Sequence, residues 1–482
     1  MIAEQRSAAL AGLERALDIV SPHTLRWTVR EADEQDVAVE RLRLLVPAAD
    51  RDAVHALLDE RHFRAVALAP WYRTPAASDR YGVDAADGTL LHVCTQRRLV
   101  LGSALGGWLP IGREPDIGAA PTIAKQAVAT AQAMSRALTL CESRLRGAAG
   151  TQQPAPDEPG HDTLHAEAFT ALFGPGPAKA VLDAAVLADA TTLRRRLDDL
   201  APRRSVRDRL RERARHALCR LAAFNRRGPR LPLLALRKRS GPALAIAVIG
   251  SDGSGKSTVS RWLAETLDMA FGARFQYFGT GDGPGSPVRR ALNGLKRRSR
   301  FGAVAPASGS GGAVVAPVRT VDTTPTSLRL IWATVVAWER LGKMRSLVRA
   351  RRAGFIVVTD RYPQDELAGI HDGPRLGHLL AAPAGCLGSA FARVERSLYA
   401  WLAGHVPDRV LLLDVPLALA RRRRPDEPEA ELARRVAVAR SLRFGDAPRL
   451  VIDASESLAT VKTRALDAVL DALSAPPASP AP

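Results

Sequence analysis

The sequence has few of the residues that build disulfide frameworks and zinc sites. It contains four cysteines in 482 residues. They stand alone, with no CxxC pair and no neighbouring histidine cluster, at Cys94, Cys141, Cys219 and Cys386. Disulfide scaffolds and structural zinc sites need paired or closely spaced cysteines. The pattern therefore excludes both and fits a reducing compartment.

Long apolar runs are also missing. A membrane-spanning helix needs about 18 or more consecutive apolar residues. The best candidate, Leu231–Gly250, is interrupted by Arg237, Lys238 and Arg239. The stretch Met1–Val20 is amphipathic and broken by charges, so it lacks the apolar centre of a signal peptide. We therefore expect a cytoplasmic protein without a transmembrane segment.

Lysine is scarce, and the positive charge is concentrated. Only seven of the 69 basic residues are lysine, and the net charge is +19. Residues 194–240 hold 17 Lys and Arg against four acids, and residues 288–300 hold six with no acid. Such stretches could bind nucleic acid or an anionic surface. Because Phe224 is the single Phe, Tyr or Trp among the arginines of 194–240, too few to stack on successive bases, we interpret 194–240 as a solvated basic bridge and keep nucleic-acid binding as the alternative.

The length and the changes of pattern indicate two domains and a bridge. Residues 1–147 alternate short helical and strand patterns, which predicts a small α/β domain. Its expected elements are a strand at Val37–Pro47, a helix at Arg51–His62, a β-like run at Leu90–Leu101 and a helix at Ala119–Gly147. Residues 148–240 begin as a polar, Pro-rich linker and continue as a helical basic bridge.

The second half, residues 241–475, has a different pattern. Short apolar runs that end in polar or Gly-rich turns alternate with helical patterns, which predicts a buried, doubly wound, five-stranded parallel sheet. The runs are Leu244–Ile249, Phe275–Phe278, Phe355–Thr359, Arg409–Leu413 and Arg449–Ile452. Residues 281–325 are rich in Gly, Pro, Ser and Ala, so we expect a disordered loop before a helix at Ser327–Arg352.

A phosphate-binding loop follows the first of these strands. The pattern GxxxxGK[ST] is matched by the consecutive residues Gly250, Ser251, Asp252, Gly253, Ser254, Gly255, Lys256 and Ser257, with Thr258 opening the next helix. Glycines let the backbone wrap closely around phosphate oxygens, and the helix N-terminus adds positive potential. We expect Lys256 to reach the β- and γ-phosphates of ATP, and the Ser257 hydroxyl to bind Mg²⁺.

Two further acids end strands at the same edge of the predicted sheet. Asp360 and Arg361 follow the third strand, where a doubly wound fold collects its ligands. There the acid can hold Mg²⁺ and the arginine can clamp a second phosphate. Asp414 ends the fourth strand, but the Pro416 that follows favours a turn or capping role for it.

Together these segments resemble thymidylate kinase. The segments are GSDGSGKST at Gly250, VVTDRYP at Val357, PDRVLLLDVPLALARRR at Pro407 and VIDAS at Val451. The resemblance implies a P-loop kinase that moves the γ-phosphoryl of Mg-ATP to a nucleoside monophosphate. It also implies that Asp252 contacts the acceptor nucleotide, that Asp360 serves the metal and that Arg361 grips the acceptor phosphate. Of the remaining positions, Tyr362 would line the acceptor site, Arg340 lies near the base pocket, and Arg422 and Arg424 are the candidates for the lid cation.

The chain departs from this family in two loops and in its front half. Residues 281–325 and Gln364–Ala392 are longer than the family's loops. Val39–Pro47, the helix after it and Leu90–Leu101 resemble a nucleotidyltransferase fold, in which one strand carries two metal-binding carboxylates. Those positions hold Arg41 and Arg43, and guanidinium groups cannot bind Mg²⁺. The resemblance thus implies a degenerate domain without catalysis.

Three hypotheses for the function follow. The leading one is a nucleoside monophosphate kinase, with dTMP as the favoured acceptor and a homodimer as a possible assembly. A second keeps the kinase machinery but takes a sugar or glycan phosphate as acceptor. A third is a nucleic-acid-binding or scaffolding ATPase that uses the basic bridge. This hypothesis predicts an affinity for polynucleotide that falls steeply as the salt concentration rises.

Overall fold

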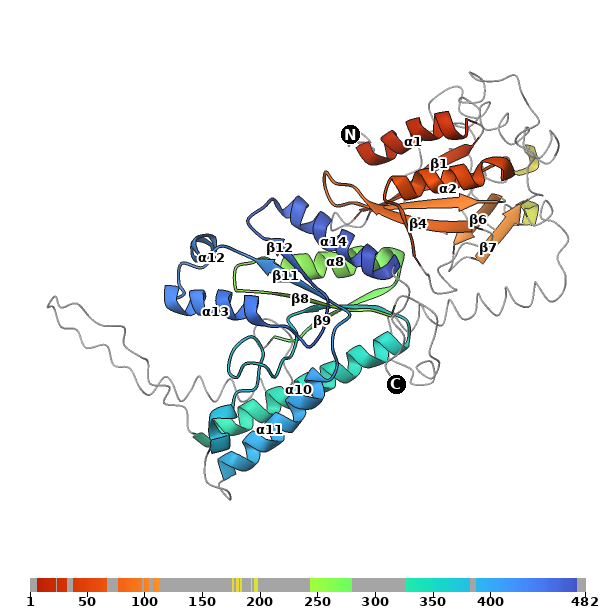
Figure 1. Cartoon of the computed structure of the whole chain (residues 1–482). Coiled ribbons are helices and arrows are strands. Elements are labelled where there is room, and N and C mark those ends of the chain that lie inside the picture. Colours follow the sequence, from red (N-terminus) through yellow and green to blue (C-terminus); the bar gives the residue numbers. More distant parts are fainter. Residues whose placement is uncertain are drawn as a thin grey trace.

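The computed structural model describes two folded parts of the chain (Figure 1). The described residues are 7–22, 24–32, 38–66, 77–97, 99–103, 107–111, 243–279, 326–381 and 387–474, with a few isolated positions between 176 and 197. The predictions for helix Ala119–Gly147 and for loop 281–325 lie outside the described residues, and so do those for nearly all of the bridge 148–240.

The front part is a five-stranded mixed sheet with two helices. The strands lie in the order β1-β2-β5-β4-β3, and β2 and β5 are parallel. The elements are α1 (Ala8–Val20), β1 (Leu25–Ala32), β2 (Ala38–Leu45), η1 (Ala48–Asp50), α2 (Arg51–Glu60), β3 (Arg64–Ala65), β4 (Ala77–Val83) and β5 (Leu90–Gln96), followed by a separate hairpin of β6 (Leu99–Ser103) and β7 (Gly107–Ile111). The strand and helix expected before residue 62 are confirmed. The single run expected at Leu90–Leu101 is instead two strands, because the chain bends at Arg97.

Alternation along β2 gives the front sheet two different faces. Leu42 and Leu44 point to one face and pack under α1 and α2, in a core with Leu13, Leu17 and Val54. Residues two apart in a strand share a face, so Arg41 and Arg43 lie on the other one.

The two arginines of β2 make contacts within the protein. Arg41 donates to the carbonyl oxygen of Met269 at 3.3 Å, and the buried Arg43 donates to that of Val100 at 3.4 Å. The likeness of this unit to a nucleotidyltransferase stays a prediction.

The second part is the expected parallel sheet. Its strands lie in the order β12-β11-β8-β10-β9, and every neighbouring pair is parallel. The elements are β8 (Ala245–Gly250), α8 (Lys256–Ala270), β9 (Ala273–Tyr277), α10 (Thr326–Arg352), β10 (Ile356–Asp360), η4 (Gly377–Ala381), α11 (Leu387–Ala403), β11 (Arg409–Asp414), α12 (Leu417–Arg423), α13 (Glu429–Ser441), β12 (Arg449–Asp453) and α14 (Leu458–Ser474). All five predicted strands are confirmed to within about two residues, as is the long helix before β10.

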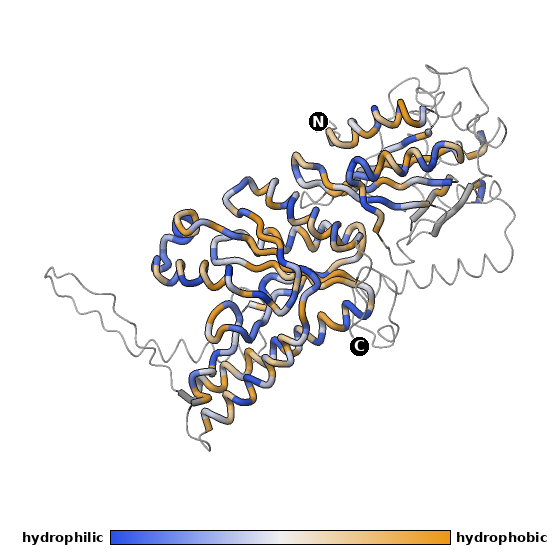
Figure 2. Tube along the Cα trace, in the orientation of Figure 1, coloured by the Kyte–Doolittle hydropathy of each residue, from blue (hydrophilic) through white to orange (hydrophobic). Residues whose placement is uncertain are grey.

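Helices cover both faces of this sheet. Along β8, Ile246 and Val248 pack against α8 and α14, whereas Ala245, Ala247 and Ile249 pack on the face covered by α10, α11 and α13. In Figure 2 the hydrophobic segments of the strands accordingly lie in the interior, between the two helical layers. A strand that is buried on both faces reads as a continuous apolar run, which is why these strands were recognisable from the sequence. No helix in the described part of the chain combines the length and the apolar character that a membrane span requires.

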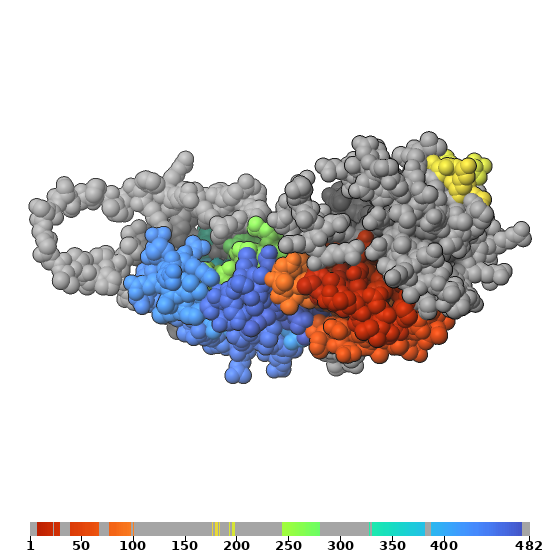
Figure 3. Space-filling model, turned by 90° about the horizontal axis from the view of Figure 1, so that it is seen from above, coloured from red at the N-terminus to blue at the C-terminus, as the bar shows by residue number. Residues whose placement is uncertain are grey.

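The two parts share one hydrophobic core. Val39, Val66, Tyr81 and Leu90 of the front sheet join the core that α8 and α14 form with the second sheet. The Tyr81 ring lies 4.5 Å, between centroids, from that of Phe271 at the end of α8. Figure 3 shows the orange and blue parts of the chain in contact along this boundary.

Charged groups reinforce the same boundary. Arg64 of β3 pairs with Asp467 at 2.8 Å and with Asp471 at 2.6 Å, both on α14. The front sheet therefore packs against α14 and also against α8, the helix that begins at the phosphate-binding loop.

We expect Tyr81→Ala to destabilise the protein by about 3 kcal/mol, since an aromatic ring that is 2% exposed would leave a cavity at this boundary. Thermal unfolding followed by circular dichroism measures the loss. Tyr81→Phe is the matched control, because it keeps the ring on Phe271, and it should retain most of the stability. An unfolding temperature unchanged in Tyr81→Ala would show that the shared core adds little.

Candidate phosphate-binding site

The site begins at the turn between β8 and α8. Gly253 and Gly255 have φ angles of +83° and +84°, a region that side chains rarely adopt, and Gly255 caps the N-terminus of α8. Gly250 is needed for space, because a Cβ there would lie 2.6 Å from Ser254 Oγ and 2.7 Å from the Leu413 carbonyl oxygen. The loop thus takes the tight form that directs backbone N–H groups at an anion.

Lys256 extends back over this loop. Its side chain is buried, and Nζ donates to the Ser251 carbonyl oxygen and to Asp252 Oδ1, each at 3.0 Å. Burial, together with the nearby Arg361, lowers the pKa of Lys256, and the Asp252 carboxylate opposes that shift. The lysine is therefore a desolvated cation that is held in place by one carboxylate.

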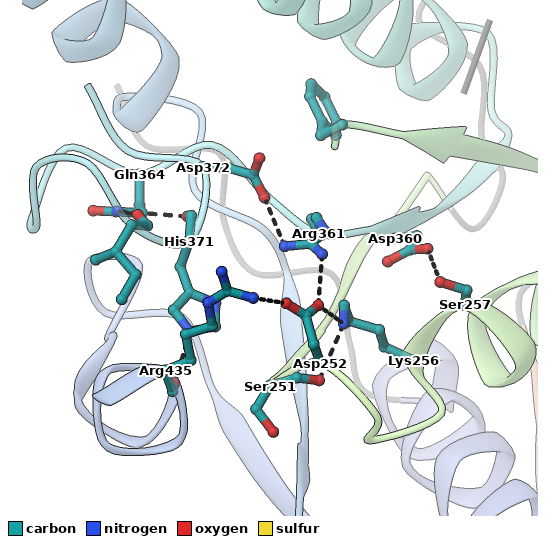
Figure 4. A network of polar contacts seen from close by, with 12 residues as sticks. Ser251, Asp252, Lys256, Ser257, Asp360, Arg361, Gln364, His371, Asp372 and Arg435 are labelled. Carbon is teal, nitrogen blue, oxygen red and sulfur yellow. Dashed lines mark hydrogen bonds and ion pairs between the residues drawn. The ribbon is translucent and has the colours of Figure 1, made fainter. Parts of the chain in front are cut away.

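Asp252 is the centre of a network of cations (Figure 4). Its Oδ1 also accepts from Arg361 at 2.9 Å, and its Oδ2 accepts from Arg435 of α13. Burial alone would raise the pKa of Asp252, but Lys256, Arg361 and Arg435 bring it far below its usual range. Three cations from three different elements converge on one carboxylate, in the arrangement that would surround a phosphate group.

Asp360 lies beside this network at the end of β10. Its Oδ2 accepts from the Ser257 hydroxyl at 2.6 Å, and burial raises the pKa of the carboxyl group. Its other oxygen is buried with no hydrogen-bond partner among the described residues, and so are the hydroxyls of Ser251 and Ser254. Unsatisfied buried polar atoms are costly, so these atoms indicate a site built for a group that satisfies them.

The carboxylate of Asp360 and the hydroxyl of Ser257 fit a Mg²⁺ ion that is bound together with a nucleotide. Within the described residues no group of three or more His, Cys, Asp or Glu side chains is placed to hold a metal by itself. Mg²⁺ is usually held by one or two carboxylates, with phosphates and water completing its shell. Asp360 and Ser257 are such a partial set.

Arg361 has an unfavourable backbone that is stabilised by its contacts. Its φ of +67° is rare for a residue with a side chain. The guanidinium bonds Asp252 and lies 3.7 Å from Asp372, and against the effect of burial these two acids raise the pKa of Arg361. Such strain clusters at functional sites, where the surrounding structure enforces it.

Arg340 lies behind Arg361, within the protein. It is 1% exposed, and its guanidinium donates to the carboxylate and carbonyl of Asp372 and to the Tyr399 hydroxyl. It orients Asp372, which in turn faces Arg361, and its assignment to the base pocket stays a prediction. Tyr362, predicted to line the acceptor site, is 2% exposed in the core and donates to the His405 carbonyl oxygen.

The arginines after β11 divide into two groups. Arg422 and Arg424, the candidates for the lid cation, are exposed, while Arg423 between them donates to the Gly253 carbonyl oxygen at 2.9 Å. Asp414 is not a helix cap: it pairs with Arg440 at 2.7 Å, and α12 begins at Leu417, where the N-cap residue Pro416 provides no side-chain cap.

The sequence did not point to Arg435 or to the role of Asp372. Arg435 also bonds Glu427 and Glu431, at 3.1 Å each, so its spacing looks like that of an ordinary exposed helical salt bridge. The His371 ring is within hydrogen-bond distance, 2.7 Å, of the Arg435 carbonyl oxygen, and Gln364 holds the same loop through the carbonyl of Ile370. The only available signal was the unusual length of the loop after residue 364.

We expect Asp252→Asn to destabilise the ligand-free protein by about 2 kcal/mol, because it leaves Lys256, Arg361 and Arg435 without their shared carboxylate. Pyrophosphate or Mg-ATP should then raise the unfolding temperature more in the variant than in the wild type, since a phosphate can replace the lost negative charge. Differential scanning fluorimetry with and without ligand measures both effects. An equal ligand-induced shift in the two proteins would contradict this role.

The order of the strands, their parallel pairing and the loop between β8 and α8 define an α/β P-loop fold. No family model matches the chain. It is 29% identical to the uncharacterized ATP-binding protein YghR of Escherichia coli K12 over 231 residues, which are 46% of this chain and 86% of YghR. It is also 29% identical to the uncharacterized ATP-binding protein YghS of the same strain over 246 residues, 49% of this chain and 96% of YghS.

Two kinases are among the solved structures that align with about half of the chain. Thymidylate kinase from Ehrlichia chaffeensis is 16% identical, with 47% of this chain and 97% of that one covered, at a TM-score of 0.26. Deoxyadenosine kinase from M. mycoides with bound dATP is 15% identical, with 47% and 100% covered, also at 0.26. Because these scores are low, the fold is assigned from the chain's own strand order and loop.

Proposed function

We propose that this protein is an ATP-dependent phosphotransferase of the thymidylate kinase type. It would move the γ-phosphoryl of Mg-ATP to a nucleoside monophosphate, with dTMP as the favoured acceptor. The observation that carries the proposal is that Lys256 and Arg361 share one oxygen of Asp252, at 3.0 and 2.9 Å. Lys256 of the P-loop and Arg361 at the end of β10 thus donate to the same carboxylate oxygen, so the two cations lie close together.

The donor side of the site is the P-loop. The N–H groups of the loop and of the start of α8 would hold the phosphates of ATP, and Lys256 would move from Asp252 to the β- and γ-phosphates. The buried hydroxyls of Ser251 and Ser254 would gain the partners that they lack among the described residues. The description of both E. coli relatives as ATP-binding proteins supports ATP as the donor.

Ser257 and Asp360 would hold Mg²⁺. Mg²⁺ held by these two side chains would supply positive charge that offsets the negative charge of the phosphates. The raised pKa of Asp360 means that its carboxylate lacks positive neighbours strong enough to offset its burial. A divalent cation held there would supply that compensation.

The acceptor side is Arg361 with its supports. A guanidinium can hold a phosphate through two parallel hydrogen bonds and so orient its oxygen for in-line attack. Asp372, itself held by Arg340, lies 3.7 Å from that guanidinium, and Asp252 would be free to contact the acceptor nucleotide once the cations turn to phosphate. Arg435, together with Arg422 and Arg424, would approach from the α12–α13 side to neutralise charge on the moving phosphoryl.

The test is product analysis with labelled ATP and a panel of acceptors. The protein is incubated with Mg²⁺ and dTMP, dUMP, UMP, CMP, AMP, GMP or sugar phosphates. Preferred labelling of dTMP would support the proposal. Labelling of a sugar phosphate alone would contradict the nucleotide as acceptor but leave the kinase activity standing. ATP hydrolysis that is stimulated by polynucleotide, without any labelled acceptor, would show that the protein is an ATPase and not a kinase.

A further inference from the structure

The loop of residues 364–376, between β10 and η4, is held in shape by buried polar side chains. Gln364 is 2% exposed, and its Nε2 donates to the carbonyl oxygens of Leu367 and Ile370 at 2.8 and 2.9 Å. Glu395 of α11 is 1% exposed and accepts from two backbone N–H groups further along the loop, at 3.0 and 2.6 Å. Buried polar groups are costly unless they are hydrogen-bonded, and the hydrogen bonds that satisfy these two side chains fix the loop.

The loop has its least favourable backbone at His371 and Asp372. Their φ angles are +44° and +63°, and left-handed residues with side chains are uncommon and usually occur singly. The next residue is Gly373, where a Cβ would collide with the carbonyl oxygen of Leu367. Backbone strain persists only where the surrounding structure enforces it, and it clusters at functional sites. The turn therefore holds the side chains of residues 371 and 372 in particular places.

These two neighbouring residues contact different sides of the site (Figure 4). The Asp372 carboxylate lies 3.7 Å from the guanidinium of Arg361, at the end of β10. The His371 ring points away from it, toward α13, where Nε2 lies 2.7 Å from the carbonyl oxygen of Arg435. A carbonyl oxygen only accepts hydrogen bonds, so Nε2 carries the hydrogen and donates it. One turn thus connects Arg361 with the helix that carries Arg435.

His371 adds a hydrogen bond to the site but no charge near pH 7. Burial lowers the pKa of His371, and the nearby cations Arg361 and Lys256 act in the same direction. The hydrogen bond to the backbone of residue 435 and the Asp372 carboxylate oppose this shift without reversing it. Because the ring is neutral, its contribution to the site is the placement of α13.

The placement of α13 decides where the Arg435 guanidinium lies. This guanidinium donates to Asp252 of the P-loop, and also to Glu427 and Glu431 at 3.1 Å each. Both glutamates belong to α13 or to the turn before it, so they move together with the helix. The hydrogen bond from His371, in contrast, joins the backbone of residue 435 to a loop on the other side of the site.

We propose that His371 is a positioning residue for phosphoryl transfer, and that its hydrogen bond to the Arg435 carbonyl oxygen sets the Arg435 guanidinium beside the P-loop. The inference rests on the proposed function, in which Arg435 neutralises charge on the moving phosphoryl. Because Asp372 is the adjacent residue and faces Arg361, the same turn keeps the two arginines at a fixed spacing across the site.

The test is whether the effect of His371 depends on the Arg435 guanidinium. In the full-length protein His371→Leu, which cannot donate a hydrogen bond, should lower the rate of transfer from labelled ATP to dTMP about 10-fold, since a small displacement of a positioning group is enough for such a loss. It should also weaken binding of a non-hydrolysable ATP analogue roughly fivefold, because a charge-assisted contact with phosphate is misplaced. In an Arg435→Ala background the same change should alter either quantity less than about twofold, because no guanidinium is left to position.

His371→Gln tests the hydrogen bond itself. A glutamine amide can donate from nearly the position of Nε2, and glutamine shares the cost of the positive φ with leucine, so it should recover most of the rate that leucine loses. His405→Leu is the matched control: its Nδ1 lies 2.9 Å from the carbonyl oxygen of Trp401, ahead of β11 and so at the sheet edge opposite the P-loop. It should change the rate less than about twofold.

Circular dichroism should show every variant folded, and His371→Ala gives the same comparison if leucine is not accommodated. Equal losses from His371→Leu with and without the Arg435 guanidinium would overturn the proposal, and so would a folded His371→Gln that recovers nothing. If the wild type labels no acceptor, the proposed function fails and binding of the ATP analogue decides the role of His371. Dependence of that binding on Arg435 would still support the positioning role, and independent effects would overturn it.

Discussion

Lys256→Ala should lower phosphoryl transfer on the order of 10²–10³-fold, because it removes a buried, preorganised cation from the transferring phosphate. The side chain is buried and donates to the carboxylate of Asp252, so the variant loses a lysine and leaves a carboxylate beside Arg361 and Arg435. Initial rates at saturating Mg-ATP measure the effect.

The matched control for this variant is Lys462→Ala. That lysine lies over the ring of Trp262, 4.9 Å from its centroid, away from the phosphate-binding loop. Its removal should change the rate less than about twofold. Normal turnover in Lys256→Ala, with an unchanged circular dichroism spectrum, would refute the assignment of the loop.

Arg361→Ala should cost a similar factor of transfer but leave ATP binding nearly intact, because the proposed role of Arg361 is to hold the acceptor phosphate. Alanine keeps a side-chain residue at the same positive φ, so the backbone cost is comparable to that of arginine. Rates as a function of acceptor concentration, with ATP affinity from isothermal titration, separate the two effects.

Arg361→Lys sharpens this test. Lysine keeps the charge but cannot make the two parallel hydrogen bonds of a guanidinium. The lysine variant should therefore recover only part of the activity that alanine loses. If both variants lose ATP affinity and keep the acceptor KM, Arg361 belongs to the donor side and the proposed division of the site is wrong.

The second sheet and the P-loop could be predicted from the sequence because their signals are local. A strand buried on both faces is apolar throughout, so it can be recognised from composition alone. The motif GSDGSGKS between such a strand and a helix predicts a phosphate-binding loop directly. Asp360 and Arg361 followed from the same reasoning, since the carboxyl ends of parallel strands meet at one edge.

The supports of the site could not be predicted because they are made by distant parts of the chain. Arg435 is 183 residues from the Asp252 that it bonds, and Arg340 is 32 residues from Asp372. Nothing in the local pattern distinguishes Arg435 from the other arginines of α13, or the buried Arg340 from its exposed neighbours. The contact of the front sheet with α8 and α14 also joins distant parts of the chain. The alternation of charged and apolar residues along β2 predicts a strand, but it does not show that Tyr81 and its neighbours pack onto these helices.

The central claim is that this edge of the sheet transfers a phosphoryl group to a phosphate-bearing acceptor. The fate of the γ-phosphate of ATP tests it most directly, and ³¹P NMR of a reaction with Mg²⁺ and dTMP follows every phosphorus atom at once. The proposed function predicts that the ATP γ-resonance is lost as two new diphosphate resonances appear for dTDP, beside those of ADP, and that Lys256→Ala shows neither change. Release of the γ-phosphate only as inorganic phosphate, at the same rate with and without any phosphate acceptor, would contradict it.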